Sequence, residues 1–390
     1  MARAPLLSPS LSSANVDTLA PAASPATTKS FSDHYSTSFS SPYKLLAVLS
    51  GHAGAVSSLA LCGEFLLSAS VAQDIIAWQH PDLRPFTRFG HGDGSVKALV
   101  AAGNRLFTAH QDRRIRVWKV SRRPGNAFRL VATLPTARDY LLRIIKRSSF
   151  IQTRRHHRRL WIEHADSISC LAVGPGVIYS GSWDKTLKVW RASDLKCIES
   201  IAAHDDAINA LVAHKGILCS ASADGKIRIW AKGKSSHCLR ATLVSRKEVS
   251  WNAVVVSDEG GFVYGGGSDG GVMGWEIEGP RVVCHAMEAH AMAVLCLCTT
   301  AGFVFSGSAD NTIGVWRREK GGGLERLGTI SGHEGPVKCL QASWRCVGGG
   351  GGFMLYSGGL DKSLRVWWLP KEYGGEGEMR EEMEKCIMVV

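Results

Sequence analysis

The chain has 390 residues, of which 45% are hydrophobic and 21% charged, and its formal net charge is +12. This composition is typical of a soluble globular protein, and no run of about 18 apolar residues predicts a membrane span. The N-terminus lacks the apolar core of a secretory signal. The eleven cysteines are an odd number without a CxxC pair. That pattern argues against a disulfide framework or a metal site and favours a reducing compartment.

Residues 1–42 are rich in Ser, Ala, Pro and Thr and poor in large apolar groups, which predicts a disordered tail. Ser-Pro pairs at Ser8, Ser24 and Ser41 leave open two interpretations, phosphorylation by proline-directed kinases or a plain flexible tail. A transit peptide is a weaker interpretation, because the tail holds only two basic residues.

From residue 43 onward, short apolar runs alternate with Gly, Asp and Asn. Runs such as AINALVA, GILCSAS and KIRIW predict strands of about four to seven residues separated by tight turns. The first such run, YKLLAVLS at 43–50, stands alone before the first Gly-His pair.

Five segments repeat one pattern, as in SGSWDKTLKVW, which ends at Trp190. Each has a Ser or Thr, an Asp four residues later and a Trp six residues after the Asp. A His precedes the Ser or Thr by sixteen or seventeen residues, and by twenty-four in the last copy. The five sets are His91, Thr108, Asp112 and Trp118; His164, Ser180, Asp184 and Trp190; His204, Ser220, Asp224 and Trp230; His290, Ser306, Asp310 and Trp316; and His333, Ser357, Asp361 and Trp367.

Two further units depart from this pattern. The first has His52, Ser68 and Trp78, with Ala72 at the Asp position. The other has Asp269 and Trp275, with Lys247 near the His position and Gly265 at the Ser position. Seven units of about forty residues therefore follow one another.

This repeat resembles the WD40 family over residues 44–368. The resemblance implies an all-β, seven-bladed WD40 β-propeller over residues 43–369, followed by an acidic C-terminal segment, 370–390. Because the first strand has no earlier unit to join, we expect residues 44–49 to supply the outer strand of the seventh blade. In one respect the chain departs from the family, since no Asp follows the closing Trp of any unit.

Ser, His and Asp in one unit also suggest the active site of a hydrolase, but an active site does not recur in five copies. In WD40 proteins, these side chains and the Trp form a buried hydrogen-bond chain, so the resemblance implies structural tetrads. The chemistry is consistent, because Trp only donates, a carboxylate only accepts, and Ser and neutral His do both. We therefore expect neither catalysis nor a cofactor.

An insertion of residues 137–160 separates the second and third units, and we expect a helical turn near 140–145 within it. It carries a basic run, Arg154, Arg155, Arg158 and Arg159, in a segment, 138–159, with eight Arg or Lys and one Asp. Three interpretations remain open: a solvated loop, a nuclear import signal, or a contact to nucleic acid.

The stretches RRHHRRLWIEHADSISCLAV and YSGSWDKTLKVWRASDLKCIESIAAHDDAINALVA are similar to the plant JINGUBANG-like group of WD40 proteins. That similarity implies a plant regulatory protein without known catalysis. We expect a scaffold or adaptor that binds other proteins, cytoplasmic or nuclear and monomeric outside complexes. The alternative is a nuclear factor that contacts nucleic acid through the basic run. We expect partners to contact exposed residues of the turns, with Trp183 as the strongest candidate. The others are Arg113, Lys185, Asp205, Asp206, Asn311 and Lys362.

Overall fold

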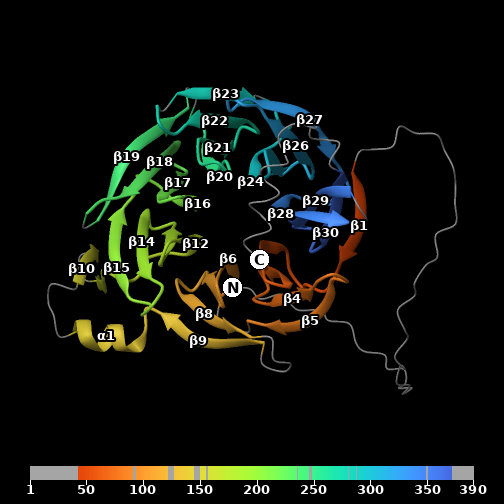
Figure 1. Cartoon of the computed structure of the whole chain (residues 1–390). Coiled ribbons are helices and arrows are strands. Elements are labelled where there is room, and N and C mark those ends of the chain that lie inside the picture. The colour runs from red at the N-terminus through yellow and green to blue at the C-terminus, as the bar shows by residue number, and fades with distance from the viewer. Residues whose placement is uncertain are drawn as a thin grey trace, which may run out of the picture. The chain divides into compact units, whose positions relative to one another are not determined.

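The computed structural model describes residues 43–90, 94–121, 127–144, 150–154, 157–234, 236–245, 248–279, 281–286, 288–347 and 350–370. In this part of the chain the strands form seven antiparallel four-stranded sheets and one two-stranded sheet. Figure 1 shows the larger sheets arranged as blades around a central axis. The structure confirms the predicted seven-bladed β-propeller. The expected tail 1–42, and residues 371–390 of the acidic segment, lie outside the described residues.

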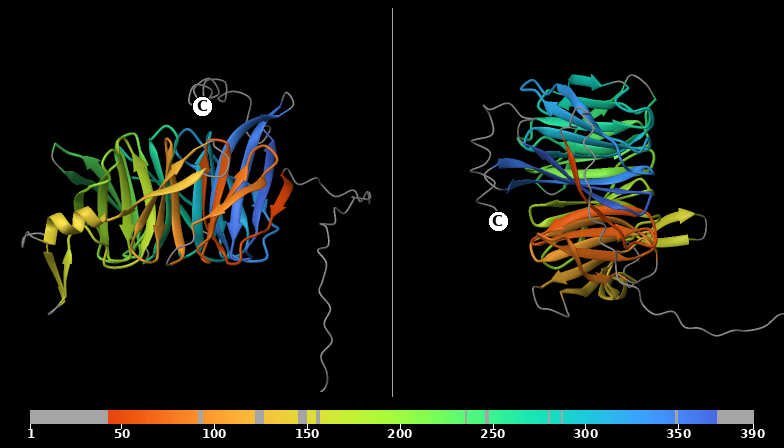
Figure 2. Two further views of the ribbon diagram at one scale, coloured as in Figure 1. Left: turned by 90° about the horizontal axis from the view of Figure 1, so that it is seen from below. Right: turned by 90° about the vertical axis from the view of Figure 1, so that its right-hand side faces the viewer.

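Each blade contains an inner, a second, a third and an outer strand, and Figure 2 shows these strands crossing the ring from one face to the other. The inner strands are β2 (Val56–Cys62), β6 (Val96–Ala102), β12 (Ile168–Gly174), β16 (Ile208–His214), β20 (Trp251–Val256), β24 (Val294–Thr300) and β28 (Val337–Val347). The second strands are β3 (Phe65–Ser70), β7 (Arg105–His110), β13 (Val177–Ser182), β17 (Ile217–Ser222), β21 (Phe262–Gly267), β25 (Phe303–Ser308) and β29 (Gly350–Gly359).

The third strands are β4 (Ile75–Gln79), β8 (Ile115–Val120), β14 (Thr186–Arg191), β18 (Lys226–Lys232), β22 (Val272–Glu276), β26 (Ile313–Arg318) and β30 (Leu364–Pro370). The outer strands are β5 (Arg84–Phe89), β9 (Phe128–Leu134), β15 (Cys197–Ala202), β19 (His237–Val244), β23 (Val282–Ala286), β27 (Leu324–Ile330) and, for the seventh blade, β1 (Lys44–Leu49). We call the face where each inner strand begins and each second strand ends the rim face.

The ring closes through β1, which pairs antiparallel with β30 from Lys44 opposite Trp368 to Leu49 opposite Leu364. The ring of Tyr43 also packs edge-on against Trp367, with 6.1 Å between centroids. This pairing covers the free edge of β30 and joins the first and last units in one blade.

A small residue at the next-to-last position of each second strand lets neighbouring blades pack closely. A Cβ atom on Gly266 would lie 2.5 Å from Val294 Cγ1 of the next blade, and one on Gly358 would lie 2.6 Å from Val56 Cγ1. The equivalent residue is Gly or Ala in every blade, and in four blades it lies within a Ser-Gly-Ser or Ser-Ala-Ser sequence. The recurring motif therefore reflects packing between blades as well as the tetrads.

Each inner strand contains a β-bulge near its start, at the rim face. The bulged residues are Ser57, Lys97, Ser169, Asn209, Asn252, Leu295 and Lys338. The Ser and Asn members donate hydrogen bonds to a carbonyl of the next blade, such as Ser57 to Val96 O at 2.7 Å and Asn209 to Trp251 O at 3.0 Å. The bulge thus provides a polar connection between neighbouring inner strands.

Candidate interaction site on the rim face

The third blade shows how a tetrad is built. Trp190 Nε1 donates to Ser180 Oγ at 2.9 Å, Ser180 Oγ lies 2.8 Å from His164 Nε2, and His164 Nδ1 lies 3.1 Å from Asp184 Oδ2. Because the carboxylate only accepts, the hydrogen bonds require a proton on His164 Nδ1, and the Ser hydroxyl then donates to Nε2. This series of hydrogen bonds connects the third strand of the blade to the turn before its inner strand.

Three other blades contain the predicted tetrad in the same arrangement. Their His Nε2 to Ser Oγ distances are 2.7, 2.8 and 2.7 Å for His204, His290 and His333. The full sets are His204, Ser220, Asp224 and Trp230; His290, Ser306, Asp310 and Trp316; and His333, Ser357, Asp361 and Trp367.

The first blade also has a complete tetrad, which the sequence analysis failed to predict. His52 Nε2 lies 2.6 Å from Ser68 Oγ, and His52 Nδ1 lies 3.1 Å from Asp74 Oδ2. Asp74 follows Ala72 by two residues and occupies the strand position of Thr186 in the third blade. A search for a carboxylate on either side of the turn would have found it.

The second blade differs from the prediction. His91 lies outside the described residues, and Thr108 Oγ1 lies 2.7 Å from Nε2 of His110, on the same strand. Trp118 Nε1 donates to Thr108 at 3.1 Å, as in the other blades. Asp112 pairs with Arg116, at 2.7 Å. Residues two apart on a strand project from the same face of the sheet. His110 can therefore contact Thr108 in the way that was expected of His91.

The fifth blade has no polar tetrad among its described residues, and Lys247 lies outside them. Trp251 occupies this space and donates from Nε1 to Gly225 O at 3.0 Å, while its ring packs edge-on against Trp275. A Cβ atom on Gly265 would lie 2.9 Å from the Trp251 ring, which explains the glycine at the Ser position. Asp269 is exposed and caps Gly271 N at 3.0 Å.

The tetrads have the electrostatics of a buried structural network. Burial lowers the pKa of His164 despite the hydrogen bond and charge of Asp184, so the imidazole is neutral at pH 7. Burial alone would raise the pKa of Asp184, but His164, Thr186 and the N–H of Ala165 hold it below its usual range. Ser180 is fully buried and its oxygen is engaged by Trp190, so a substrate has no path to it.

The turns between second and third strands carry four predicted partner-binding residues, Arg113, Lys185, Asn311 and Lys362. Each has a left-handed backbone, with φ of 67°, 71°, 70° and 64°. Gly225 and Gly270 occupy the equivalent positions in two other blades, so the turn itself requires this conformation. Arg113, Lys185 and Lys362 are exposed on the rim face, and Asn311 is half-buried.

Trp183 lies in the turn of the third blade and is 44% exposed, although it is a large apolar side chain. The ammonium group of Lys97, from the second blade, lies 5.6 Å from the centre of its ring. This cation–π contact holds the indole beside the bulged residue of a neighbouring blade.

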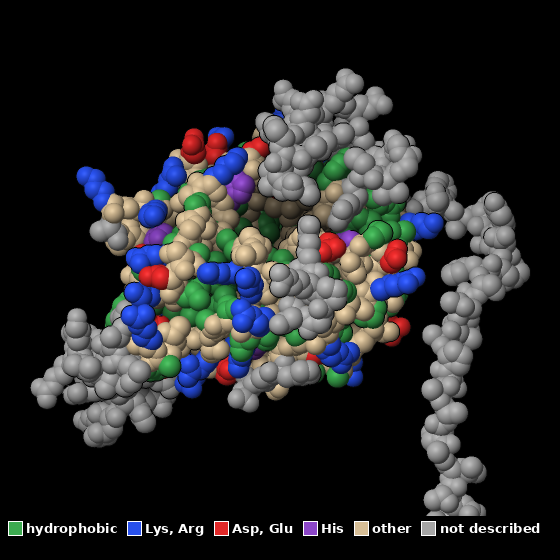
Figure 3. All heavy atoms as spheres, turned by 60° about the horizontal axis from the view of Figure 1, so that its bottom comes forward, with side chains coloured by type: hydrophobic (Ala, Val, Ile, Leu, Met, Phe, Trp, Pro, Cys, Tyr) green, Lys and Arg blue, Asp and Glu red, His purple; other side chains and the backbone are tan. Residues whose placement is uncertain are grey.

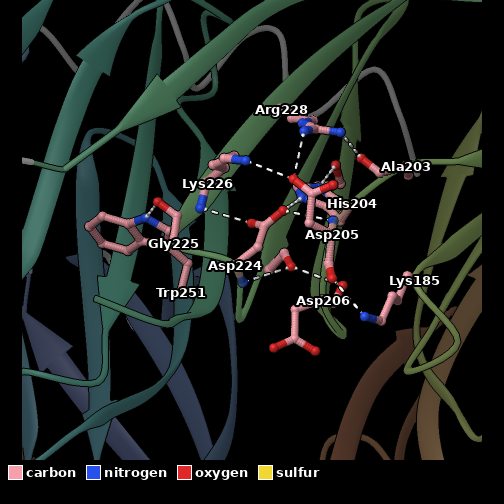
Figure 4. Close-up of polar contacts among 12 residues, drawn as sticks. Lys185, Ala203, His204, Asp205, Asp206, Asp224, Gly225, Lys226, Arg228 and Trp251 are labelled. Atoms are coloured by element: carbon pink, nitrogen blue, oxygen red, sulfur yellow. Dashed lines mark hydrogen bonds and ion pairs between the residues drawn. The ribbon is translucent and has the colours of Figure 1, made fainter. Parts of the chain in front are cut away.

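The two aspartates after His204 are in different electrostatic states (Figure 4). Asp205 forms ion pairs with Lys226 at 2.7 Å and Arg228 at 3.5 Å, and its carbonyl accepts from Lys185 at 2.7 Å. The carboxylate of Asp206 points away from this group in the figure and accepts the N–H of Ala207. Asp206 therefore has more of its charge available to a partner than Asp205.

The insertion contains α1 (Ala137–Ile144) and a hairpin of β10 (Phe150–Arg154) and β11 (His157–Leu160), at the outer side of the third blade in Figure 1. Arg154 lies in β10, Arg158 and Arg159 lie in β11, and Arg155 is outside the described residues. The expected helical turn is thus a helix of two turns that begins earlier.

The base of the insertion is anchored to the third blade by a buried cation. Lys188, 2% exposed, donates from Nζ to Trp161 O and to Ser200 Oγ, both at 2.6 Å. Burial lowers the pKa of this ammonium group. Tyr140 of α1 donates to Glu163, next to a cavity of about 220 Å³.

Lys and Arg side chains are spread over the surface drawn in Figure 3, between apolar side chains and a smaller number of acidic ones. Within the described residues, no helix has the length and hydrophobicity of a membrane span.

Repeated four-stranded blades with buried tetrads define a repeat propeller. The family model described as WD domain, G-beta repeat, matches residues 84–119, 155–191, 195–231, 281–317 and 324–367. Together with the seven blades, these matches identify the chain as a WD40-repeat protein. The matches leave out the inner three strands of the first and fifth blades, the two units that depart from the repeat.

Curated relatives match parts of the chain. Zinc finger CCCH domain-containing protein 59 of Arabidopsis thaliana is 28% identical over 111 residues, 28% of this chain and 18% of the relative. An F-box/WD-40 repeat-containing protein of Arabidopsis thaliana is 25% identical over 226 residues, 57% of this chain and 38% of the relative. Eukaryotic translation initiation factor 3 subunit I of Bombyx mori is 38% identical over 64 residues, 16% of this chain and 17% of the relative. The chain thus spans well under half the length of each of these relatives.

Proposed function

We propose that the protein is a non-catalytic scaffold that binds other proteins through its rim face. The observation that carries this proposal is the contrast between buried and exposed positions of the same repeat. The Ser, His and Asp side chains are buried and hydrogen-bonded to one another in five blades. At the turn position directly before the Asp or its equivalent, the side chain changes from blade to blade, from Val71 to Trp183 to Leu360. A buried frame that repeats from blade to blade, with exposed turn residues that differ between blades, suits the binding of a specific macromolecule.

Trp183 is the central element of the proposed contact surface, because an exposed aromatic ring beside charged groups is a frequent hot spot. Lys185 in the same turn, Arg113 in the second blade and Asp206 in the fourth would flank it with charges that select the partner, and Lys362 would extend the surface to the seventh blade. Asp205 contributes less, since it is neutralised by its own blade.

The experiment is affinity capture from a cell extract with the full chain, followed by measurement of affinity for each captured protein. Trp183→Ala should weaken binding by about 30-fold, which corresponds to about 2 kcal/mol for a hot-spot residue. Leu239→Ala is the matched control, because Leu239 is 47% exposed but lies on an outer strand. Equal loss with both variants, or no loss with Trp183→Ala, would contradict the proposal.

The proposal extends to a plant regulatory protein of the JINGUBANG-like group that acts in the cytoplasm, the nucleus or both. Its support is the similarity of the segment around His164 to that group and the plant origin of several curated relatives. A fluorescent fusion in plant cells tests the location. Retention in an organelle or secretion would contradict it.

A second candidate is a nuclear factor that contacts nucleic acid through the arginines at 154–159. Its support is the hairpin of β10 and β11, which carries Arg154, Arg158 and Arg159 and is followed by Trp161, whose carbonyl binds Lys188. Duplex and single-stranded probes should then bind the full chain with strong salt dependence, and deletion of 138–159 should abolish binding. Loss of nuclear accumulation alone would indicate an import signal instead.

A further inference from the structure

Two lysines occupy a position that has a different role in most other blades. Among the seven bulged residues at the start of the inner strands, four are Ser or Asn and bind the next blade's backbone. Lys97 and Lys338 occupy the same position in the second and seventh blades. In this position, the ammonium group of Lys97 lies 5.6 Å from the centre of the Trp183 ring.

Both lysines line the same cavity of about 260 Å³, the central channel bordered by the inner strands. Among the described residues, no carboxylate lies within ion-pair distance of either ammonium group. Burial, and then the nearby charge of Lys338, lower the pKa of Lys97. Two cations that repel each other in a partly enclosed space form a site that an anion would stabilise.

Exposed apolar side chains flank this pair on the rim face. Val71 in the first blade, Trp183 in the third and Leu360 in the seventh are 44%, 44% and 48% exposed, and they occupy the same turn position. Trp183 directly contacts Lys97. Exposed acidic side chains also occur in this sector, at Asp166 in the third blade and Glu334 in the seventh. The part of the sector next to the channel therefore combines the positive charge of Lys97 and Lys338 with apolar surface.

We propose that this sector binds a partner segment whose Asp or Glu side chain enters the channel between Lys97 and Lys338, with an apolar neighbour against Trp183. The cavity volume suits one or two side chains and excludes a whole domain. The inference rests on the proposed scaffold function and specifies its partner as an acidic, apolar peptide segment. Binding should weaken steeply with salt, since the contact is an ion pair at a solvent-connected site.

The test uses the full chain and three synthetic peptides that share a Leu-rich frame and carry Glu, Gln or phosphoserine at the central position. Fluorescence anisotropy should show the Glu peptide binding at least about tenfold more tightly than the Gln peptide, equal to about 1.4 kcal/mol. Lys97→Ser with Lys338→Ser should remove this difference and should keep the fold, because Ser57 and Ser169 occupy the position in other blades.

The matched control is Lys119→Ser with Lys232→Ser, which changes the net charge equally at two exposed lysines that do not line the channel. A charge reversal, Lys97→Glu with Lys338→Glu, should favour a fourth peptide, with Lys at the central position, over the Glu peptide. Equal binding of Glu and Gln peptides, binding of phosphoserine alone, or equal loss in the control would overturn the inference. Captured partners that bind the Lys97→Ser, Lys338→Ser variant normally but lose binding with Trp183→Ala would overturn the anion site and leave the scaffold function standing.

Discussion

Replacement of Asp184 by Ala tests whether the tetrad is structural. Asp184 accepts hydrogen bonds from His164 Nδ1 at 3.1 Å, Ala165 N at 2.6 Å, Thr186 N at 2.9 Å and Thr186 Oγ1 at 2.6 Å. Asp184→Ala removes the acceptor of several donors, and each buried donor left without a partner costs about 1–3 kcal/mol. Because Thr186 Oγ1 can still accept from His164, the total loss in the free energy of unfolding should be about 2–4 kcal/mol. Guanidinium unfolding followed by tryptophan fluorescence measures this change in the free energy of unfolding.

Asp112→Ala is the matched control for this prediction, because among the described residues this carboxylate pairs with Arg116 and with no histidine. Asp112 binds Arg116 and the N–H of Arg114 at a half-exposed position, so its loss should cost about 1 kcal/mol. Equal costs for the two variants, or an unchanged midpoint for Asp184→Ala, would refute the structural role of the tetrad.

Three further predictions concern pH, the insertion and ring closure. Burial lowers the pKa of His110 to about 4, so the unfolded chain binds more protons between pH 6.5 and 4, and stability should fall by about 3 kcal/mol over that range. His110→Asn should remove this part of the pH dependence in unfolding curves, and an unchanged slope would contradict it. Lys188→Met should raise the rate of tryptic cleavage within 138–159 by about tenfold, because Trp161 O loses a hydrogen bond to a charged group worth about 1.4 kcal/mol. Mass spectrometry measures this rate, and an unaltered rate would argue against Lys188 as the anchor of the insertion. Deletion of residues 1–50 should lower the melting temperature by exposing the edge of β30, whereas deletion of 1–40 should leave it unchanged; equal effects would exclude β1 as the closing strand.

The repeat made the architecture predictable because its spacing is set by blade geometry. Asp, Ser and Trp sit at fixed distances along two adjacent strands, so the third and fourth blades were predicted down to individual side chains. In the five blades with a complete tetrad the histidine also lies four residues before the inner strand, and the longer spacing of the last copy comes from the extended hairpin of β28 and β29. In the second blade, His110 supplies the imidazole from the strand itself, and sequence spacing alone gave no reason to prefer it over His91.

The rim face was predictable only in outline, because exposed positions carry no packing signal. The turn residues were predicted as partner contacts from their place next to the Asp of each unit. Lys97 and Lys338, which line the channel, were not predicted as partner contacts. Each lies near the start of an apolar strand, where its sequence context is that of any solvent-facing lysine. Only closure of the ring brings the two residues, from strands far apart in the chain, into the same channel.

The first blade suggests that the tetrad depends on where the carboxylate lies in space and not on its place in the sequence. Asp74 occupies the position of Thr186, and Ala72 occupies that of Asp184, yet His52 Nδ1 still contacts a carboxylate. Both turns share one backbone, since Ala72 N and Asp184 N donate to the preceding Ser hydroxyl at 3.0 and 3.1 Å. Asp74→Thr alone should therefore cost about 2 kcal/mol, and adding Ala72→Asp should restore most of it by recreating the usual order. If the second change gives no recovery in unfolding experiments, the two carboxylate positions are not equivalent, and the contacts of Asp74 with Arg88 and Ser70 are part of the difference.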